Sequence, residues 1–138
     1  MRIFLDSDVI ISSLLSSSGA SHFLIHQTQV KLLISSISHK ELKVVIKRLN
    51  IEPSKLKDLI NKKFEVLTIN NSQEDIKQKY MNFVVDIGDA HIVAGANKGN
   101  SKYLITYNLK HFKKDKIKNE LDISIMTPAL FLQYLRLN

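Results

Sequence analysis

Three carboxylates in this sequence stand where chemistry could occur: Asp6, Glu41 and Asp89. Asp6 directly follows a short apolar run. Asp89 precedes Ile92 and Val93 by three and four residues, which puts it on the buried face of a helix, in the first turn. A carboxylate drawn out of water is costly unless it is paired or bound to metal. Because the chain has no cysteine, a cluster of these acids would hold Mg²⁺ or Mn²⁺, which prefer oxygen ligands.

The first of these acids also has a purely structural interpretation. Asp6 or Asp8 could cap the helix that follows, and Ser7 could serve as the cap instead. Capping is the commoner role for a lone aspartate in this position. Asp6 therefore gains its functional meaning only in combination with the other acids.

The other two acids have structural interpretations as well. Ser38 and Glu41 have the spacing of a capping box, in which Glu41 would bond back to the N-cap amide. Asp89 could simply be an acid that interacts favourably with the positive end of its helix. Asp86, three residues earlier, could cap that helix or share the site. Both interpretations remain open on the sequence pattern.

The apolar periodicity predicts strands that alternate with helices. Strands are expected at residues 2–5, 32–35, 64–69, 103–106 and 123–126. Helices are expected at 9–15, 20–29, 38–49, 53–61, 72–83, from 86 or 89 to 98 with Gly99 ending it, and 129–135. This alternation is typical of an α/β fold, a three-layer sandwich with a central, mostly parallel sheet of about five strands covered on both faces.

Such a sheet gathers functional groups beyond the carboxyl ends of its strands. The residues expected there are Asp6 to Asp8, Ser38 to Glu41 and Thr106 to Asn108, and the helix that Asp86 and Asp89 open could face the same crevice. The sequence therefore predicts that acids far apart along the chain meet at one edge of the sheet.

The whole chain is expected to form one domain, residues 1–138, because no repeat or Gly/Pro-rich linker divides it. The N-terminal run reaches an acid at Asp6, so neither a signal peptide nor a membrane span is expected, and a cytoplasmic protein is. The net charge of +7 favours contact with polyanions, nucleic acid first.

Four motifs together resemble the PIN-domain family. They are the strand Phe4-Leu-Asp-Ser-Asp-Val, Ser38-x-x-Glu41-Leu42 at a helix start, Asp86-x-x-Asp89 before a small apolar helix, and Leu104-Ile-Thr106-Tyr-Asn108 with Phe112 after it. Each motif is weak by itself. All four occur in the family's order and span nearly the whole chain, and this ordered set is specific.

The resemblance implies a Mg²⁺- or Mn²⁺-dependent endoribonuclease in which Asp6, Glu41 and Asp89 are metal ligands. Asn108 stands where the family often has an aspartate. That change removes a negative charge, so one metal ion is expected more firmly than two. Asn108 is nonetheless expected to take part in the site, with Thr106 positioning it, or both could form only a turn after the strand. Many small PIN proteins are toxins, so an antitoxin partner and a homodimer are also implied.

Lysines cluster near the predicted acids and could guide an RNA backbone toward them. Those expected at the RNA are Lys40, Lys110, Lys113 and Lys114. Solvated helix faces are the alternative explanation for the same pattern.

Two other functions remain open. Asp6 and Asp8 resemble the Asp-x-Asp start of a haloacid-dehalogenase-like phosphatase, with Asp6 as the nucleophile and Asp8 as the acid, although Val9-Ile10 stands where that family has Gly-Thr. In a non-catalytic RNA-binding or interaction domain, the acids would be helix caps and the lysines the working surface.

Overall fold

The structure, a computed structural model, describes residues 1–137. Its centre is a five-stranded sheet in which every pairing is parallel and the strand order is β3-β2-β1-β4-β5. The strands are β1 (Arg2–Leu5), β2 (Lys31–Ser35), β3 (Phe64–Leu67), β4 (Tyr103–Ile105) and β5 (Ser124–Met126). The predicted parallel sheet is thus confirmed, and its strands begin within about a residue of where the pattern put them.

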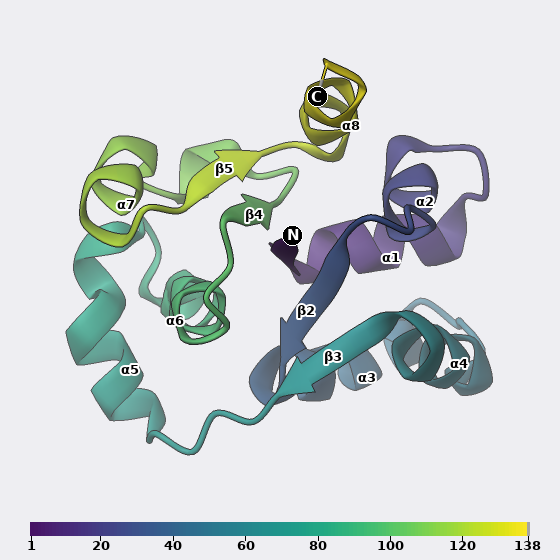
Figure 1. The fold of residues 1–138 in the computed structure, drawn as a ribbon. Helices are drawn as coiled ribbons and strands as arrows, with labels where there is room; N and C mark the ends of the chain where they lie inside the picture. The colour runs from purple at the N-terminus through teal and green to yellow at the C-terminus, as the bar shows by residue number, and fades with distance from the viewer. Residues whose placement is uncertain (138) are drawn as a thin grey trace.

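Helices cover both faces of the sheet, as the two sides of Figure 1 show. One layer holds α5 (Gln73–Tyr80), α6 (Ala90–Lys98) and α7 (Lys114–Leu121). The other holds α1 (Ser7–Leu15), α2 (Ala20–Ile25), α3 (Ser36–Arg48), α4 (Pro53–Lys63) and α8 (Pro128–Leu137). Three 3₁₀ turns, η1 (Met81–Phe83), η2 (Ile87–Asp89) and η3 (Leu109–His111), connect these elements. The three-layer α/β/α architecture is therefore confirmed.

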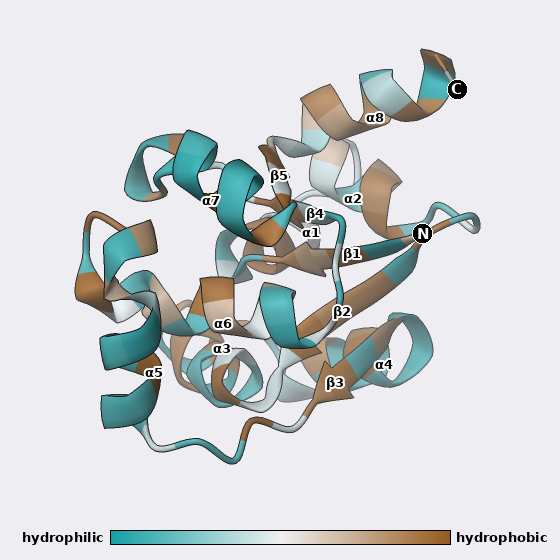
Figure 2. Cartoon of the chain, turned by 60° about the vertical axis from the view of Figure 1, so that its left-hand side comes forward, coloured by the Kyte–Doolittle hydropathy of each residue, from teal (hydrophilic) through white to brown (hydrophobic). Residues whose placement is uncertain are grey.

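Alternate residues of each strand supply the two cores, because side chains in a strand point to opposite faces. In β1, Phe4 packs under α6 in the core of one layer, whereas Ile3 and Leu5 belong to the core of the opposite layer. All three side chains are fully buried. Figure 2 shows the strands largely in apolar colours, whereas α5 and α7, which lie on one face of the sheet, are largely hydrophilic.

Gly95 lets α6 lie directly on the sheet. A Cβ at this position would come 2.6 Å from Cζ of Phe4 in β1, closer than side chains can pack. The helix consequently approaches β1 so closely that its N-terminal end, with Asp89, reaches the carboxyl ends of the central strands. The small, apolar character of this helix is thus what brings its acid to the site.

Several predicted elements differ in detail from the structure. The second helix ends at Ile25 rather than near Gln29, and α3 begins at Ser36, with Ser35 rather than Ser38 as its cap. Gly99 ends α6 with an ordinary φ of −80°, and Asn100 adopts the left-handed conformation instead. Helix α7 was not predicted, because Ile117 is its only buried residue.

No helix within residues 1–137 is long and apolar enough to cross a membrane.

Candidate active site

Asp6 occupies the point where β1 becomes α1. Its backbone N–H donates to the carbonyl of Ile105 in β4, which ties it to the neighbouring strand end. One carboxylate oxygen, Oδ1, accepts a 2.7 Å hydrogen bond from the N–H of Ser7 and caps α1. The cap uses one oxygen of this carboxylate and leaves Oδ2 for other contacts. Ser7 enters the site through this backbone donor.

The second oxygen of Asp6 is held by Thr106, which follows β4 and is fully buried. The Thr106 hydroxyl donates to Oδ2 of Asp6 at 2.9 Å and lies 3.4 Å from Oδ2 of Asp8. A hydroxyl has one hydrogen to give, so the shorter contact to Asp6 dominates. The backbone of Thr106 is itself fixed by a hydrogen bond from its N–H to the carbonyl of Met126.

Asp8 receives the remaining donors of this loop. Its Oδ2 accepts from the N–H of Tyr107 at 3.1 Å and from the side-chain amide of Asn108 at 3.0 Å. The N–H of Asn108 donates to Oγ1 of Thr106 at 3.0 Å, so the two residues form a tight turn after β4. The other oxygen of Asp8, Oδ1, is buried and has no hydrogen-bond partner within residues 1–137.

The aspartates resist ionisation in this setting. Burial first, and then the nearby charge of Asp8, raise the pKa of Asp6 from 3.8 to about 6. Burial also raises the pKa of Asp8. The pKa of Asp89 is raised by burial, with smaller contributions from Asp86 and Glu41, although His111 opposes the shift. Three carboxyls thus share a site whose negative charge is incompletely compensated.

Two histidines that the sequence analysis did not single out contact the remaining acids. His91 Nε2 lies 2.8 Å from Oε1 of Glu41, and His111 Nδ1 lies 3.4 Å from Oδ2 of Asp89. The capping-box interpretation of Glu41 is wrong, because Ser35 caps α3 and the Glu41 side chain turns to His91. The available signal was spacing, since His91 follows Asp89 by two residues and His111 follows Asn108 by three.

Asp86 has a structural role at the entrance to α6. Its Oδ1 accepts a 2.8 Å hydrogen bond from the N–H of Gly88 and caps the turn η2 that leads into the helix. Asp86 remains close enough to raise the pKa of Asp89. Of the two open interpretations, the cap is therefore realised, and Asp86 borders the acidic cluster without a hydrogen bond to it.

The donor set suits a hard divalent cation in its chemistry. All candidate ligands are carboxylate oxygens, three of them with raised pKa values, and Oδ1 of Asp8 is a buried acceptor without a donor. As the side chains stand in residues 1–137, no three Asp, Glu or His residues are arranged to ligate one ion together. The carboxylates nonetheless sense each other's charge, Asp89 acting on Asp6 and Glu41 acting on Asp89.

The predicted RNA-binding lysines are exposed but do not form one patch around the acids. Lys40 lies beside Glu41 at the rim of a hollow that it shares with Lys77, a residue the sequence analysis did not select. Lys110 belongs to η3, directly after Asn108. Lys113 and Lys114 lie at the start of α7, where the N–H of Lys113 donates to the carbonyl of Phe83.

Solved structures with the same fold include toxin–antitoxin proteins. VapBC2 from Rickettsia felis, bound to a DNA fragment from its promoter, superposes with a TM-score of 0.64 at 13% identity over 92% of this chain and 98% of the other. A toxin–antitoxin complex from Klebsiella pneumoniae gives 0.62 at 22% identity, covering 91% and 97%. VapC20 from Mycobacterium tuberculosis, described as a sarcin–ricin-loop-cleaving toxin, gives 0.54 at 13% identity, covering 86% and 95%.

The sequence itself identifies the family. The family model of the PIN domain matches residues 2–110, which include the first three predicted motifs and the fourth as far as Lys110. The protein therefore belongs to the PIN-domain family. No curated protein matches the chain by sequence.

Proposed function

We propose that this protein is a metal-dependent endoribonuclease of the toxin type. The observation that carries the proposal is the convergence of Asp6, Asp8 and Asp89, all with raised pKa values, beyond the carboxyl ends of β1 and β4. Carboxyls that repel each other inside a site are stable as anions only when a cation neutralises them. Family membership supports the nuclease assignment, and the similar toxin folds support the toxin type.

Asp6, Glu41 and Asp89 are the residues that we expect to hold Mg²⁺ or Mn²⁺, with Asp8 beside them. When bound, the ion would neutralise charge on a phosphodiester and make water a better nucleophile. Thr106 orients the carboxylate of Asp6 through its 2.9 Å hydrogen bond. Glu41 would have to exchange its contact with His91 for the ion, and this exchange links metal binding to the approach of α3 and α6.

Asn108 serves the site through Asp8 in this proposal. Its amide compensates part of the charge of Asp8 without adding a carboxylate. The cluster therefore has three acids plus Asp8 and a neutral amide, which favours one firmly bound ion over two. Lys40 and Lys110, which lie next to Glu41 and two residues after Asn108 in the sequence, are two of the cations that would contact the RNA backbone.

RNA cleavage by the purified protein tests the proposal directly. We expect cleavage of unstructured RNA with Mg²⁺ or Mn²⁺, no cleavage with EDTA, and a loss of at least about 100-fold in Asp6→Asn and Asp89→Asn. Asp58→Asn, an exposed position in α4, is the matched control and should cleave normally. Absence of metal-dependent cleavage across a random RNA pool would contradict the proposal. Hydrolysis of a simple phosphomonoester with covalent labelling of Asp6 would instead support the phosphatase alternative.

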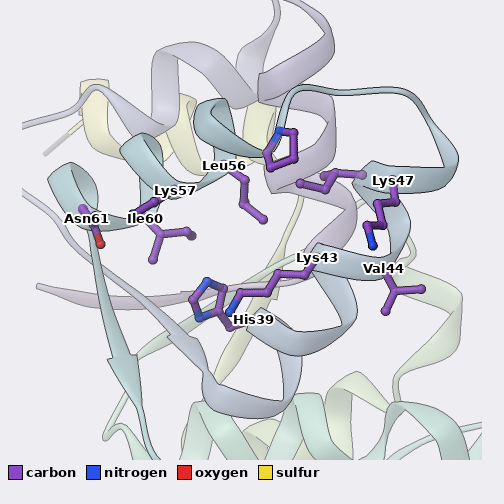
Figure 3. Close-up of a pocket in the computed structure, with 10 residues that line it drawn as sticks. His39, Lys43, Val44, Lys47, Leu56, Lys57, Ile60 and Asn61 are labelled. Carbon is purple, nitrogen blue, oxygen red and sulfur yellow. The ribbon is translucent and has the colours of Figure 1, made fainter.

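A protein inhibitor is the partner expected for a toxin, and an apolar groove between α3 and α4 offers a surface for it. Its floor includes Ile46, Leu56 and Ile60, and its rim carries Lys43, Lys47 and Lys57. Figure 3 shows Leu56 and Ile60 pointing from α4 toward the helix that bears His39 and Lys43. The groove holds about 880 Å³ and no acidic residue lines it, so an acidic, amphipathic segment of an antitoxin is the occupant that fits its charge.

Binding to this groove has a simple test. A genuine antitoxin should bind the wild-type protein, and Leu56→Glu or the triple change of Lys43, Lys47 and Lys57 to Glu should weaken binding by at least about tenfold. RNA cleavage should survive in the lysine variant, because these residues lie outside the acidic cluster. Light scattering on the same samples would also show whether the protein is the expected homodimer.

A further inference from the structure

We infer that the hollow beside Glu41 binds a nucleobase of the RNA strand, next to the phosphodiester that is cleaved. This inference rests on the proposed nuclease function and adds a site that recognises one base of the RNA substrate. The hollow has a volume of about 350 Å³ and lies between the start of α3, the start of α5 and the turn η2. Glu41 and His91 form part of its wall, and Glu41 is close enough to Asp89 to raise the pKa of that carboxyl, so the hollow adjoins the acidic cluster.

The apolar part of the wall comes from three separate elements. Ile37 belongs to α3, Ile76 to α5 and Ile87 to η2. Ile76 is buried, whereas Ile87 leaves 47% of its surface exposed. An exposed isoleucine at the mouth of a hollow is costly to leave in water, and a flat apolar ring inserted against it would remove that surface from solvent. Because η2 and α5 both pack on α6, the spacing between Ile76 and Ile87 is fixed by the fold.

The polar part of the wall matches the edge of a base. Gln73 lines the hollow and its side-chain amide makes no hydrogen bond within residues 1–137. An amide presents a donor and an acceptor side by side, the arrangement that pairs with neighbouring donor and acceptor groups on a base edge. A purely aliphatic ligand would leave this amide unused, and a simple anion would leave the isoleucines exposed.

The charges around the hollow suit a nucleotide whose base is inserted. Lys40 and Lys77 lie at the rim, and neither forms an ion pair in the described part of the chain. Each can meet a backbone phosphate. Glu41 lines this hollow and is close enough to Asp89 to raise the pKa of that carboxyl, so a strand anchored by its base would bring its next phosphate near the carboxylates. The larger α3–α4 groove has lysines as well, but it has neither Gln73 nor a carboxylate in its lining.

Methyl NMR with isoleucine-labelled protein tests base binding without requiring cleavage. Each of the four nucleoside 5′-monophosphates is titrated in EDTA, and signals are assigned through Ile37→Val, Ile76→Val and Ile87→Val. We expect saturable shifts of these three methyls with at least one nucleotide, while Ile46 and Ile60 of the α3–α4 groove do not move. Shifts of both sets alike, shifts caused equally by inorganic phosphate, or no shift with any nucleotide would overturn the inference.

Cleavage of a random RNA pool supplies the second readout. Gln73→Ala and Ile87→Ala should reduce the preference for the base beside the cleaved bond by about tenfold, a change that one base contact can produce. Val85→Ala is the control, because Val85 is 71% exposed, lies two residues before Ile87 and does not line the hollow. Unchanged preference in both variants would overturn the inference while leaving the nuclease proposal intact. Nucleotide binding without any RNA cleavage would support the pocket and contradict the nuclease.

Discussion

The side-chain amide of Asn108 donates a 3.0 Å hydrogen bond to Oδ2 of Asp8. Asp8 has one buried oxygen without a partner and a raised pKa, so its ionised form is destabilised in the folded protein. An aspartate at position 108 could accept but could not donate when ionised, and two carboxylates would then face each other. The asparagine is consequently a stabilising partner for the metal-free site.

Asn108→Asp is therefore expected to destabilise the protein in EDTA at neutral pH, by about 1–2 kcal/mol, because it replaces a donor with a like charge. The loss should shrink in acid, where the introduced carboxyl is protonated and can donate again. Mn²⁺ should stabilise this variant more than the wild type. Denaturant unfolding with and without metal measures all three effects. Asn119→Asp, on the exposed side of α7, is the control, and an equal loss in both variants would contradict the role given to Asn108.

Asp6→Asn is expected to stabilise the metal-free protein at neutral pH. The folded-state pKa of Asp6, about 6, lies above its unfolded value of 3.8, so the folded state holds this proton more tightly. Stability should thus fall as pH rises from about 4 through 6 and stay low above it, by up to about 3 kcal/mol. Asparagine can still cap α1 through its oxygen.

The pH dependence of unfolding in EDTA checks this prediction. The wild type should lose stability across the interval from about pH 4 to 6, and Asp6→Asn should lose less. If the free energy of unfolding changed with pH in the same way in both proteins, ionisation of Asp6 would not destabilise the fold and the prediction would be wrong. RNA cleavage by the same variant should be lost. The aspartate at position 6 would then be needed for activity although it lowers the stability of the metal-free protein.

Metal binding should offset the loss of folding stability that the ionised carboxylates of the acidic cluster cause. Mn²⁺ at about 100 times its dissociation constant should stabilise the wild type by about 2.7 kcal/mol, because the ion binds only the folded site. The effect should grow as pH rises through 6, since protonated Asp6 does not bind the ion. Thermal unfolding with and without Mn²⁺ measures it. Asp89→Asn should lose the stabilisation and Asp115→Asn, in α7, should keep it. A wild type that does not respond to metal would contradict the proposed site.

The parts of the site that could be predicted from the sequence were those encoded by local order. Asp6 after an apolar strand and Asp89 before an apolar helix face were predicted to lie at one sheet edge. In the structure Asp6 follows β1 and Asp89 is the N-cap of α6, close enough to raise the pKa of Asp6. A parallel sheet brings such positions together whatever its loops do. Thr106 was expected to position Asn108 or to form only a turn with it, and the hydrogen bond from the N–H of Asn108 to Oγ1 of Thr106 fits both interpretations.

Contacts between elements distant in the sequence were not accessible in this way. Glu41 fitted a capping box, but the chain enters α3 two residues earlier, which moves the cap to Ser35 and frees Glu41 for His91 on α6. Nothing in the local pattern distinguishes these outcomes. Helix α7 was not predicted because it has too few apolar residues to show a helical period. Lys77 was not selected because the sequence pattern does not show that it lies near Lys40 in the folded protein.

RNA binding should depend on Lys40 and Lys77 through counterion release. Each cation that contacts a phosphate of single-stranded RNA contributes about 0.7 to the slope of log affinity against log salt. Lys40→Ala or Lys77→Ala in an Asp6→Asn background should lower the slope by about that amount, whereas Lys57→Ala, at the α3–α4 groove, should not. Fluorescence anisotropy over a salt series measures the slope, and equal effects of all three changes would indicate a diffuse basic surface.

Gly95→Ala should damage both stability and activity, because it pushes α6 away from β1. The added Cβ would lie 2.6 Å from Cζ and 2.7 Å from Cε2 of Phe4, and the fully buried ring has little room to move. Overpacking of this kind costs about 1–3 kcal/mol, and the helix that shifts is the one that carries Asp89. Denaturant unfolding and RNA cleavage should both decline, and Phe4→Leu in the same chain should restore part of each. Gly19→Ala is the matched control, since its nearest neighbour would lie 3.8 Å away. Normal cleavage by a destabilised Gly95→Ala protein would show that the position of Asp89 does not depend on this contact.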